Sequence, residues 1–368
     1  MIYGWIEDIE EFRNIAHEWD EALIASGKYN LFLLSDFIIN WWKYFHNNLK
    51  LRIFVVYNNN KISGGIPLYI KRCGFIRILY YIGGSALGYT EPLYVTPKTE
   101  ILPIIINALK GRTDWDALYL PDIRAQNMLV EEYAHLHQDE MFWLRLKQDH
   151  MNWAIDLSDG QEKYRAIISA KLRRDLRAKR RRLVKEYGEI RLKKIVGRTE
   201  IERYFDLYIQ FSLRAFSARG RYSSLKDKKH AAFLKDFLVT LEQGNGLDAQ
   251  LLLANDRILA ISFGQMFGKE FNWLLTAFNY DYKYFRPGYL LIEELIQDVC
   301  NRGVTYYNWY GYERFYKTQW CNHQIPLYRF FLIRRTTKGI CYKTAQVLKE
   351  VLRSNKAILR FIQRLKQS

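Results

Sequence analysis

Three residues near the C-terminal end of the chain are of types that can carry acid–base chemistry. Glu313, Tyr316 and Lys317 follow a strand-like run at residues 304–309. A carboxylate can take a proton from an attacking amine or hydroxyl, a tyrosine can give one to a leaving group, and a lysine can stabilise developing negative charge. Glu313 and Lys317 also stand at i and i+4, so a plain ion pair on a helix surface explains their spacing as well.

A basic, glycine-containing turn at residues 286–288 separates a strand-like run, 271–278, from an apolar-periodic run, 289–299. Proline suits the first turn of a helix, where its missing N–H would have no partner, and glycine lets a ligand approach the backbone. Helix amides, the helix dipole and Arg286 would together favour an anion, and a pyrophosphate would fit. An ordinary strand-to-helix turn explains these residues about as well, because neither the P-loop nor the dinucleotide-binding glycine pattern is present.

Positive charge is concentrated in two segments. Residues 171–185 hold nine basic residues and one acid, and residues 338–368 hold eight basic residues and one acid, so the two supply 15 of the net 17 charges. The first segment is predicted to be a helix with one apolar stripe, formed by Leu172, Leu176, Leu183 and Tyr187. The like charges on the opposite face repel one another. This face is either simply solvated, or it binds a polyanion that relieves the repulsion, such as tRNA, a sugar-nucleotide diphosphate, an acidic glycan or anionic lipid.

The second basic segment, residues 338–368, has the pattern of an amphipathic helix. It either packs on the body of the protein or attaches to an anionic membrane surface. The N-terminus lacks a signal-peptide pattern, and no apolar run approaches the roughly 20 residues that span a bilayer. We therefore expect a cytoplasmic protein, peripheral to the inner face of the membrane if this segment binds lipid.

Composition excludes several classes of protein. A hydrophobic content of 49% and an aromatic content of 16% exclude a disordered chain. The four cysteines have neither metal-site spacing nor a disulfide framework, so we expect free thiols and no metal. No helix-turn-helix or other reader motif is present, which argues against specific duplex recognition.

Two further groups of residues are candidate ligand contacts. Arg219 and Arg221 flank a glycine after a predicted helix, where they can grip a phosphate or carboxylate or merely flank a helix cap. Tyr89 and Glu91 lie in an irregular loop of the first half, which we expect to face the second half and to contact an acceptor.

The two halves of the 368-residue chain show the same order of predicted elements: hairpin, strand, helix, strand, helix, strand. In the first half, helices are expected within 1–50 and at 100–110 and 124–136, with strands at 51–57, 62–70, 75–82, 115–120 and between 142 and 157. In the second half, helices are expected within 161–187 and at 199–217 and 289–299, with strands at 249–254, 258–267, 271–278, 304–309 and 325–333. Such alternation predicts mixed-sheet α/β domains, with boundaries at 1–157 and 158–335 and a basic helical tail at 336–368.

Three segments resemble a known family. Residues 169–183 resemble the arginine-rich helix that opens the catalytic half of GNAT-like acetyltransferases of the CelD/BcsL type, a family associated with cellulose and exopolysaccharide synthesis. Residues 284–291 resemble its tyrosine–x–x–proline–glycine–x–leucine–leucine segment, and residues 308–320 its glycine–x–glutamate–x–x–tyrosine–lysine–x–x–tryptophan ending. With a similar run at 32–42, the resemblance covers most of residues 30–335.

The resemblance implies two tandem GNAT-like domains, the first degenerate and on the acceptor side, the second catalytic. It implies transfer of an acetyl or other acyl group from acetyl-CoA or another acyl-CoA to an amine or hydroxyl, on a sugar, sugar-nucleotide or polysaccharide precursor of the cell envelope. Glu313 would be the base, Tyr316 the acid toward the leaving thiolate and Lys317 the electrostatic stabiliser. The donor would be held by Leu275, Ala277, Arg286, Gly288, Tyr289 and Leu290. The substrate would be contacted by Tyr89, Glu91, Arg219, Arg221 and Trp320.

Two departures from the family pattern keep other functions open. Asn308 stands where the family usually has aspartate, and the glutamine/arginine–x–x–glycine–x–glycine/alanine phosphate loop is missing. Fem-type aminoacyl transferases share the tandem architecture and a lysine at the place of Lys317, and they use aminoacyl-tRNA. The alternatives are therefore a tRNA-dependent transferase of peptidoglycan or peptide synthesis, or a non-catalytic protein that binds glycan or nucleic acid.

Overall fold

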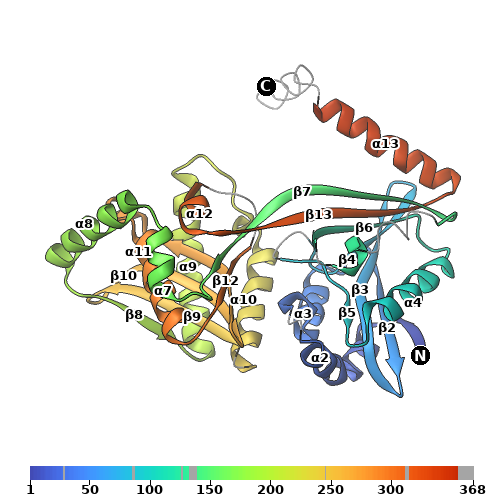
Figure 1. Ribbon diagram of the computed structural model, residues 1–368, viewed down its shortest axis with the longest axis horizontal. Helices are drawn as coiled ribbons and strands as arrows, with labels where there is room; N and C mark the ends of the chain where they lie inside the picture. Colours follow the sequence, from blue (N-terminus) through green and yellow to red (C-terminus); the bar gives the residue numbers. More distant parts are fainter. Residues whose placement is uncertain are drawn as a thin grey trace.

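The computed structural model describes residues 1–27, 30–84, 88–125, 127–131, 139–244, 246–310 and 315–354. In these residues one mixed sheet of 13 strands runs through the molecule, with helices packed against it (Figure 1). The strand order is β1-β2-β3-β4-β6-β13-β7-β12-β11-β10-β9-β8, and β5 pairs with β3. Strands of both halves of the sequence therefore belong to a single sheet.

The elements of the first half are β1 (Ile2–Ile6), α1 (Ile9–Asn14), α2 (Ala16–Ala25), η1 (Leu31–Leu33), α3 (Ser35–Phe45), β2 (Leu49–Asn58), β3 (Lys61–Cys73), β4 (Ile76–Tyr81), β5 (Leu93–Tyr94), α4 (Lys98–Lys110), β6 (Ala117–Arg124), α5 (Met128–Glu131) and β7 (Phe142–Asp156). Those of the second half are α7 (Gln161–Ile167), α8 (Ala170–Tyr187), β8 (Ile190–Ile195), α9 (Arg198–Ser217), η2 (Ser224–Lys226), α10 (Lys228–Gln243), β9 (Leu247–Ala254), β10 (Arg257–Phe267), β11 (Glu270–Phe278), η3 (Tyr280–Phe285), α11 (Pro287–Asn301), β12 (Tyr306–Trp309), α12 (Phe315–Trp320), β13 (His323–Arg334) and α13 (Thr337–Ser354).

The predicted duplication is confirmed by strand pairing. In the first half the antiparallel hairpin β2–β3 leads to β4, then to helix α4, then to β6, which lies parallel to β4. In the second half the hairpin β9–β10 leads to β11, then to α11, then to β12, which lies parallel to β11. Both halves thus contain one parallel pair joined by a crossover helix, as a βαβ unit requires.

Strands β7 and β13 join the halves. Strand β13 pairs with β6 along one edge and with β7 along the other, while β7 pairs with β12 through residues 153–156. Figure 1 shows the two long strands side by side across the middle of the molecule. The boundary near residue 157 stays a prediction, and the last strand of the second half lies in the sheet beside β6.

Packing of apolar side chains also links the halves. One core cluster combines residues of η1 and α3 with residues of α9, α10 and the strands β9 and β10. Within it the ring of Phe37 lies 5.1 Å from that of Phe237, at 75°. Such edge-to-face contacts add about 0.5–1.5 kcal/mol beyond area burial. The relative position of the halves is therefore fixed by core packing as well as by shared strands.

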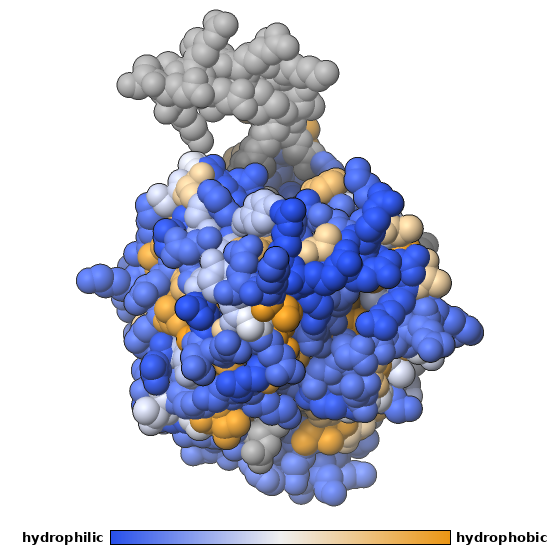
Figure 2. Space-filling model, turned by 90° about the vertical axis from the view of Figure 1, so that its left-hand side faces the viewer, coloured by the Kyte–Doolittle hydropathy of each residue, from blue (hydrophilic) through white to orange (hydrophobic). Residues whose placement is uncertain are grey.

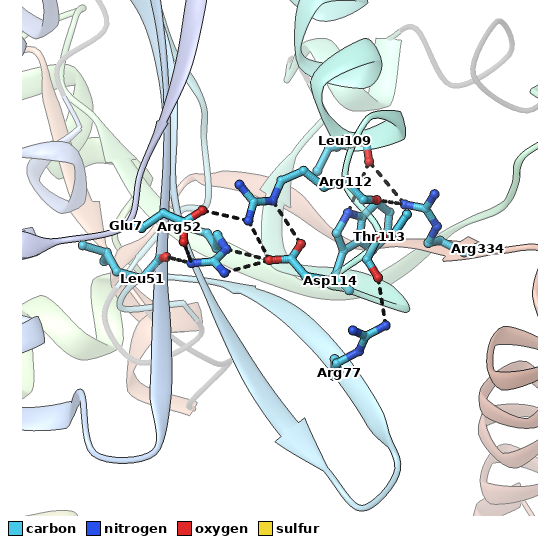
Figure 3. A network of polar contacts seen from close by, with 10 residues as sticks. Glu7, Leu51, Arg52, Arg77, Leu109, Arg112, Thr113, Asp114 and Arg334 are labelled. Atoms are coloured by element: carbon cyan, nitrogen blue, oxygen red, sulfur yellow. Dashed lines mark hydrogen bonds and ion pairs between the residues drawn. The ribbon is translucent and has the colours of Figure 1, made fainter.

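A network of ion pairs closes the outer end of the first half (Figure 3). The carboxylate of Asp114 accepts hydrogen bonds from Nε of Arg52 at 2.9 Å and from Nη2 of Arg112 at 2.7 Å. Glu7 pairs with both guanidinium groups at 2.8 Å. Since the side chain of Arg52 is only 9% exposed, its charge depends on these two carboxylates for compensation.

Several predicted elements are confirmed and several predictions are wrong. The hairpin predicted around residues 58–61 is present, with Asn59 and Asn60 at positive φ, as a two-residue turn of the primed type demands. The first residues were expected to be helical but form β1, which pairs with β2. Strand β8 and helix α10 were not predicted. The helix expected at 124–136 is described only as α5; Arg124 belongs to β6, and residues 132–138 lie outside the described part.

Helix α8 has the predicted stripe. Leu172, Leu176 and Leu183 are at most 4% exposed, and they pack beneath the basic face. Ser169 caps the helix, because its hydroxyl accepts the amide hydrogen of Leu172. Among the described helices, none combines the length and apolar character needed to cross a bilayer.

Candidate active site

Strands β11 and β12 part in the middle of the second half. They pair in parallel from Glu270 to Trp273 on one strand and from Tyr306 to Trp309 on the other. Beyond these residues β12 ends, whereas β11 continues to Phe278, paired with β10 alone. Within the described ranges, no strand bonds to the other edge of residues 274–278. On that edge the backbone amides and carbonyls of this segment have no strand partner among the described residues, and the place where the two strands part is called the opening below.

Predicted donor contacts Leu275 and Ala277 lie on this segment, opposite Phe263 and Ile261 of β10. The side chain of Ala277 is 7% exposed and belongs to the core shared by both halves. Any contact of Ala277 with a ligand would therefore come mainly from its backbone, whereas the side chain of Leu275 is only partly buried.

Lys317 lies at the end of β12, beside the opening. Its Nζ donates hydrogen bonds to the carbonyl oxygens of Trp309, at 3.1 Å, and Tyr310, at 2.6 Å. The residue is 4% exposed. The side-chain nitrogen of Lys317 is therefore held at the C-terminal end of β12 by two backbone carbonyls.

Of the other predicted catalytic residues, Tyr316 packs against Trp309, with ring centroids 5.8 Å apart. Glu313 lies outside the described residues. The structure thus brings Tyr316 and Lys317 to the end of β12 together.

Buried asparagines and tyrosines form a polar cluster beside the opening. The hydroxyl of Tyr89 donates to Oδ1 of Asn308 at 3.1 Å. Nδ2 of Asn152 donates to the same oxygen at 2.9 Å, and Nδ2 of Asn308 donates to Oδ1 of Asn272 at 3.3 Å. The hydroxyl of Tyr310 also donates to Oδ1 of Asn272, at 2.6 Å. Tyr89 therefore reaches the second half, as its loop was expected to do.

Burial determines the protonation state of the Tyr89 hydroxyl in this cluster. Desolvation raises the pKa of Tyr89, although the nearby charge of Arg124 opposes that shift. Asn152 is 1% exposed and Asn308 3%. The Tyr89 hydroxyl therefore keeps its proton at neutral pH and acts as a hydrogen-bond donor.

Glu91 is engaged within the first half. Its carboxylate accepts two hydrogen bonds of 2.7 Å from Nη2 of Arg124, and the guanidinium lies 4.6 Å from the ring centroid of Tyr89. This charge pair stacks on the tyrosine and fixes its orientation. Among the described residues, the hydrogen bonds of the Glu91 carboxylate stay within the first half, where they support Tyr89.

At the predicted anion turn, Arg286 occupies the left-handed region, with φ 53° and ψ 52°. Its carbonyl oxygen accepts the amide hydrogens of Tyr289 at 2.9 Å and Leu290 at 3.2 Å. Two amides expected to face an anion are thus used inside the turn. Gly288 leaves room, because a Cβ added there would meet only Phe278, at 3.5 Å. An anion here would rely on the Gly288 amide and on the guanidinium of Arg286, which pairs with Asp175 at 2.9 Å.

The remaining predicted contacts surround the first turns of α11. The hydroxyl of Tyr289 donates to Oε1 of Gln319 at 2.7 Å, and its ring lies 6.1 Å from Trp320. Leu290 is fully buried in the core. Arg219 lies 5.9 Å from the ring of Phe278, at the end of β11, whereas Arg221 is exposed.

Sequence reasoning missed Asn152, Asn272 and Arg124. The available signal was a side-chain amide inside an apolar strand, as Asn272 is within residues 271–278. Such a residue must find a partner when the strand is buried. Which partner it finds depends on strand order, and strand order is not visible in periodicity.

Comparisons with known proteins agree with this geometry. Residues 170–318 match the family model described as an acetyltransferase (GNAT) domain. No curated protein matches the chain. The solved structure of FemX aligns with a TM-score of 0.62 at 10% identity, covering 90% of this chain and 97% of that one.

Two other solved structures are similar over their whole length. One is a conserved protein of unknown function from Bacteroides thetaiotaomicron, with TM-score 0.56, 12% identity, and coverage of 91% of this chain and 100% of that chain. The other is the C-terminal domain of a putative lysylphosphatidylglycerol synthetase from Agrobacterium fabrum, with TM-score 0.54, 13% identity, and coverage of 93% and 98%. At these identities the likeness concerns the fold. The chain is a mixed α/β protein whose two halves repeat one order of strands and helices, and residues 170–318 of its second half match the GNAT acetyltransferase domain.

Proposed function

We propose that this protein is an acyltransferase that moves an acetyl or other acyl group from acyl-CoA to an amine or hydroxyl of a sugar, sugar-nucleotide or polysaccharide precursor, in the manner of the CelD/BcsL type. The observation that carries the proposal is the parting of β11 and β12 beside the buried amine of Lys317, within the segment that matches a GNAT domain. The identification of acetyl-CoA as donor and of a carbohydrate as acceptor rests on the family resemblance described above.

In the proposed reaction the acceptor attacks the thioester carbonyl carbon directly. An amide of residues 274–278 donates a hydrogen bond to the developing oxyanion, and the charge of Lys317 adds to its stabilisation. The new C–N or C–O bond forms as the C–S bond breaks. The acceptor's proton goes to Glu313, and the CoA thiolate takes a proton from Tyr316.

The acceptor would lie between the halves, beside the polar cluster. Tyr89 and Asn152 come from the first half, and Asn308 from the second, so a ligand there touches both. Hydroxyl and amide groups of this kind pair well with sugar hydroxyls.

A second candidate function is aminoacyl transfer from charged tRNA, as in Fem-type enzymes. The exposed arginines of α8 favour it, since a cationic helix face binds a phosphate backbone. A binding constant for tRNA that falls steeply with salt, with no acyl-CoA binding, would select this donor.

We propose further that α13 and the basic residues after it attach the protein to an anionic membrane surface. Ile340, Val347 and Leu348 are 48–57% exposed on α13, on a helix with lysines at 338 and 343. Exposed apolar side chains on a cationic helix are the features that lipid binding requires.

Calorimetric titration of acetyl-CoA into the purified protein tests the donor. Arg286→Ala and Gly288→Asp should each weaken binding if the diphosphate lies on the turn, whereas Arg198→Ala, an exposed arginine that pairs with Glu202, should not. Gly288→Asp is a fair test because a Cβ fits at this position. Absence of binding by any acyl-CoA would contradict the proposed donor.

A further inference from the structure

A pocket of about 530 Å³ lies between α7, α8, α11 and the end of α12. This volume is within the range of about 300–1,000 Å³ typical of ligand sites. Its charged lining residues are Arg165, Arg173, Arg177, Arg180, Glu293 and Glu294. Figure 2 looks onto the end of the molecule that carries α8 and shows small apolar patches surrounded by hydrophilic side chains.

The charge of the pocket is positive and only partly compensated. Arg180 is neutralised locally, because it pairs with Glu293 at 2.9 Å and with Glu294. Arg165, Arg173 and Arg177 have no carboxylate partner among the described residues. Nη2 of Arg165 donates to Oε1 of Gln297 and Nε of Arg177 donates to the carbonyl oxygen of Arg173, both at 3.3 Å, and the other N–H groups of the three are available to an anion.

Of the three, Arg173 gives the strongest indication of a bound anion. Its Nε is buried and has no hydrogen-bond partner in the described part of the chain. A buried N–H that donates to nothing is destabilising, because it has lost its hydrogen bond to water without replacement. A bound anion would supply the missing acceptor.

Five apolar or aromatic side chains of the lining, each at most 7% exposed, are called the floor of the pocket here. Ile168, Leu176 and Ile296 line it together with the aromatic residues Tyr164 and Trp320. A bare phosphate would gain nothing from such a floor. A ligand that carries phosphates on a flat, weakly polar ring system would use both the floor and the arginines.

The pocket adjoins the turn at Arg286. Trp320 lines the pocket and lies 6.1 Å from Tyr289, in the first turn of α11. Asp175, which pairs with Arg286, stands on α8 between Arg173 and Arg177. A donor whose diphosphate lies at the turn can thus extend along α8 into the pocket.

We propose that this pocket binds the phosphorylated adenosine end of coenzyme A, with Arg173 and Arg177 on its 3′-phosphate. This assignment rests on the proposed acyl-CoA donor. It makes the arginine-rich helix part of the donor site, in addition to the turn at the N-terminus of α11. Phosphate–arginine hydrogen bonds are charge-assisted and therefore among the stronger polar contacts in proteins.

Calorimetry with three probes tests the assignment: acetyl-CoA, acetyl-dephospho-CoA, which lacks the 3′-phosphate, and adenosine 3′,5′-bisphosphate. The double variant Arg173→Gln/Arg177→Gln should weaken acetyl-CoA binding by about 10- to 100-fold. The control double variant Arg174→Gln/Arg181→Gln removes the same charge from exposed positions of α8 outside the pocket. Its effect should stay within about twofold.

In the wild-type protein, acetyl-dephospho-CoA should bind more weakly than acetyl-CoA by the same factor by which the pocket substitutions weaken acetyl-CoA binding. In the pocket variant, acetyl-CoA and acetyl-dephospho-CoA should then bind alike. Arg177→Gln alone, at an exposed side chain, serves if the double variant is unstable. Equal effects of the pocket and control variants would overturn the assignment and indicate long-range attraction only.

The experiment separates this assignment from the proposed function. If acetyl-CoA binds and the pocket variant leaves its affinity unchanged, the pocket is not the adenosine site, although the donor stands. If no acyl-CoA binds, the proposed acyl-CoA donor is wrong. Binding of adenosine 3′,5′-bisphosphate then tests the assignment of the pocket by itself. Binding of the bisphosphate that the pocket variant abolishes would then show that the pocket takes a phosphorylated adenosine, although the donor is not an acyl-CoA; its failure to bind overturns the assignment.

Discussion

Tyr89 and Asn308 stand 219 residues apart in the sequence, yet the hydroxyl of Tyr89 donates a hydrogen bond of 3.1 Å to Oδ1 of Asn308. Nδ2 of Asn152, on β7, donates to the same oxygen and to the tyrosine hydroxyl. Each half of the molecule thus completes the hydrogen bonding of the other at the place where β11 and β12 part. Loss of one member leaves buried polar groups without partners.

Tyr89→Phe should lower the free energy of unfolding by about 1–2 kcal/mol, because the variant removes a donor and an acceptor from buried asparagines. Urea denaturation measures this change. Tyr222→Phe, at a residue that is 73% exposed, should change it by less than about 0.5 kcal/mol. An equal effect of both substitutions would contradict the structural role of the Tyr89 hydroxyl.

The Asn308→Asp variant should have a lower free energy of unfolding at high pH than at low pH. Nδ2 of Asn308 donates to Oδ1 of Asn272, so an ionised carboxylate would place two oxygen acceptors against each other in a buried site. Burial raises the pKa of such a carboxyl above the unfolded value of about 3.9, so its proton must be kept. Relative to wild type, the unfolding free energy should fall as the pH rises from about 4 to 8. Urea denaturation of both proteins at several pH values measures this fall. A difference in unfolding free energy between variant and wild type that does not change with pH would contradict the prediction.

Asp114→Asn tests the ion-pair network of the first half. Burial alone would raise the pKa of Asp114, but hydrogen bonds from Arg112 and Arg52 outweigh it and lower the pKa to about 2. Its stabilising contribution is therefore complete above about pH 4 and is lost as the pH falls toward 2. The variant should lose about 1–2 kcal/mol at pH 7 and less at pH 3. Asp159→Asn, at a carboxylate that is 75% exposed, is the matched control.

Lys317→Met should reduce kcat for acyl transfer by about 10²- to 10³-fold, because the charge that stabilises the oxyanion is removed. It should also lower stability, since the carbonyl oxygens of Trp309 and Tyr310 lose their donor. The KM for acyl-CoA should change little. Activity per folded molecule, with the folded fraction taken from a thermal melt, separates the two effects. Unchanged kcat in a folded variant would remove Lys317 from the reaction.

Membrane attachment through α13 predicts sedimentation with vesicles that contain anionic phospholipid. Val347→Gln/Leu348→Gln, at side chains 48% and 57% exposed, should weaken sedimentation by about 10-fold, since apolar insertion is lost. Ile24→Gln, at a side chain of α2 that is 62% exposed, should not. Failure of the wild-type protein to bind anionic vesicles at low salt would exclude this attachment.

The hairpins and crossover helices of each half were predictable because their signals are local. Asn59 and Asn60 mark one turn, and the leucines of α8 mark one buried face. The pairing of β13 with β6 was not predictable, because periodicity identifies a strand and does not identify its neighbour. For the same reason Tyr89 could be expected to face the second half, whereas its partners Asn152 and Asn308 could not be named.

The place of β13 in the sheet has a consequence for biosynthesis. Its partner β6 ends at Arg124, and β13 begins at His323, about 200 residues later. At translation rates of about 5–20 residues per second, the edge of β6 stays without this neighbour for about 10–40 s on the ribosome. An open strand edge is prone to pair with other chains. We therefore expect the nascent protein to need chaperone protection in that interval, and chains released before β13 is made to aggregate.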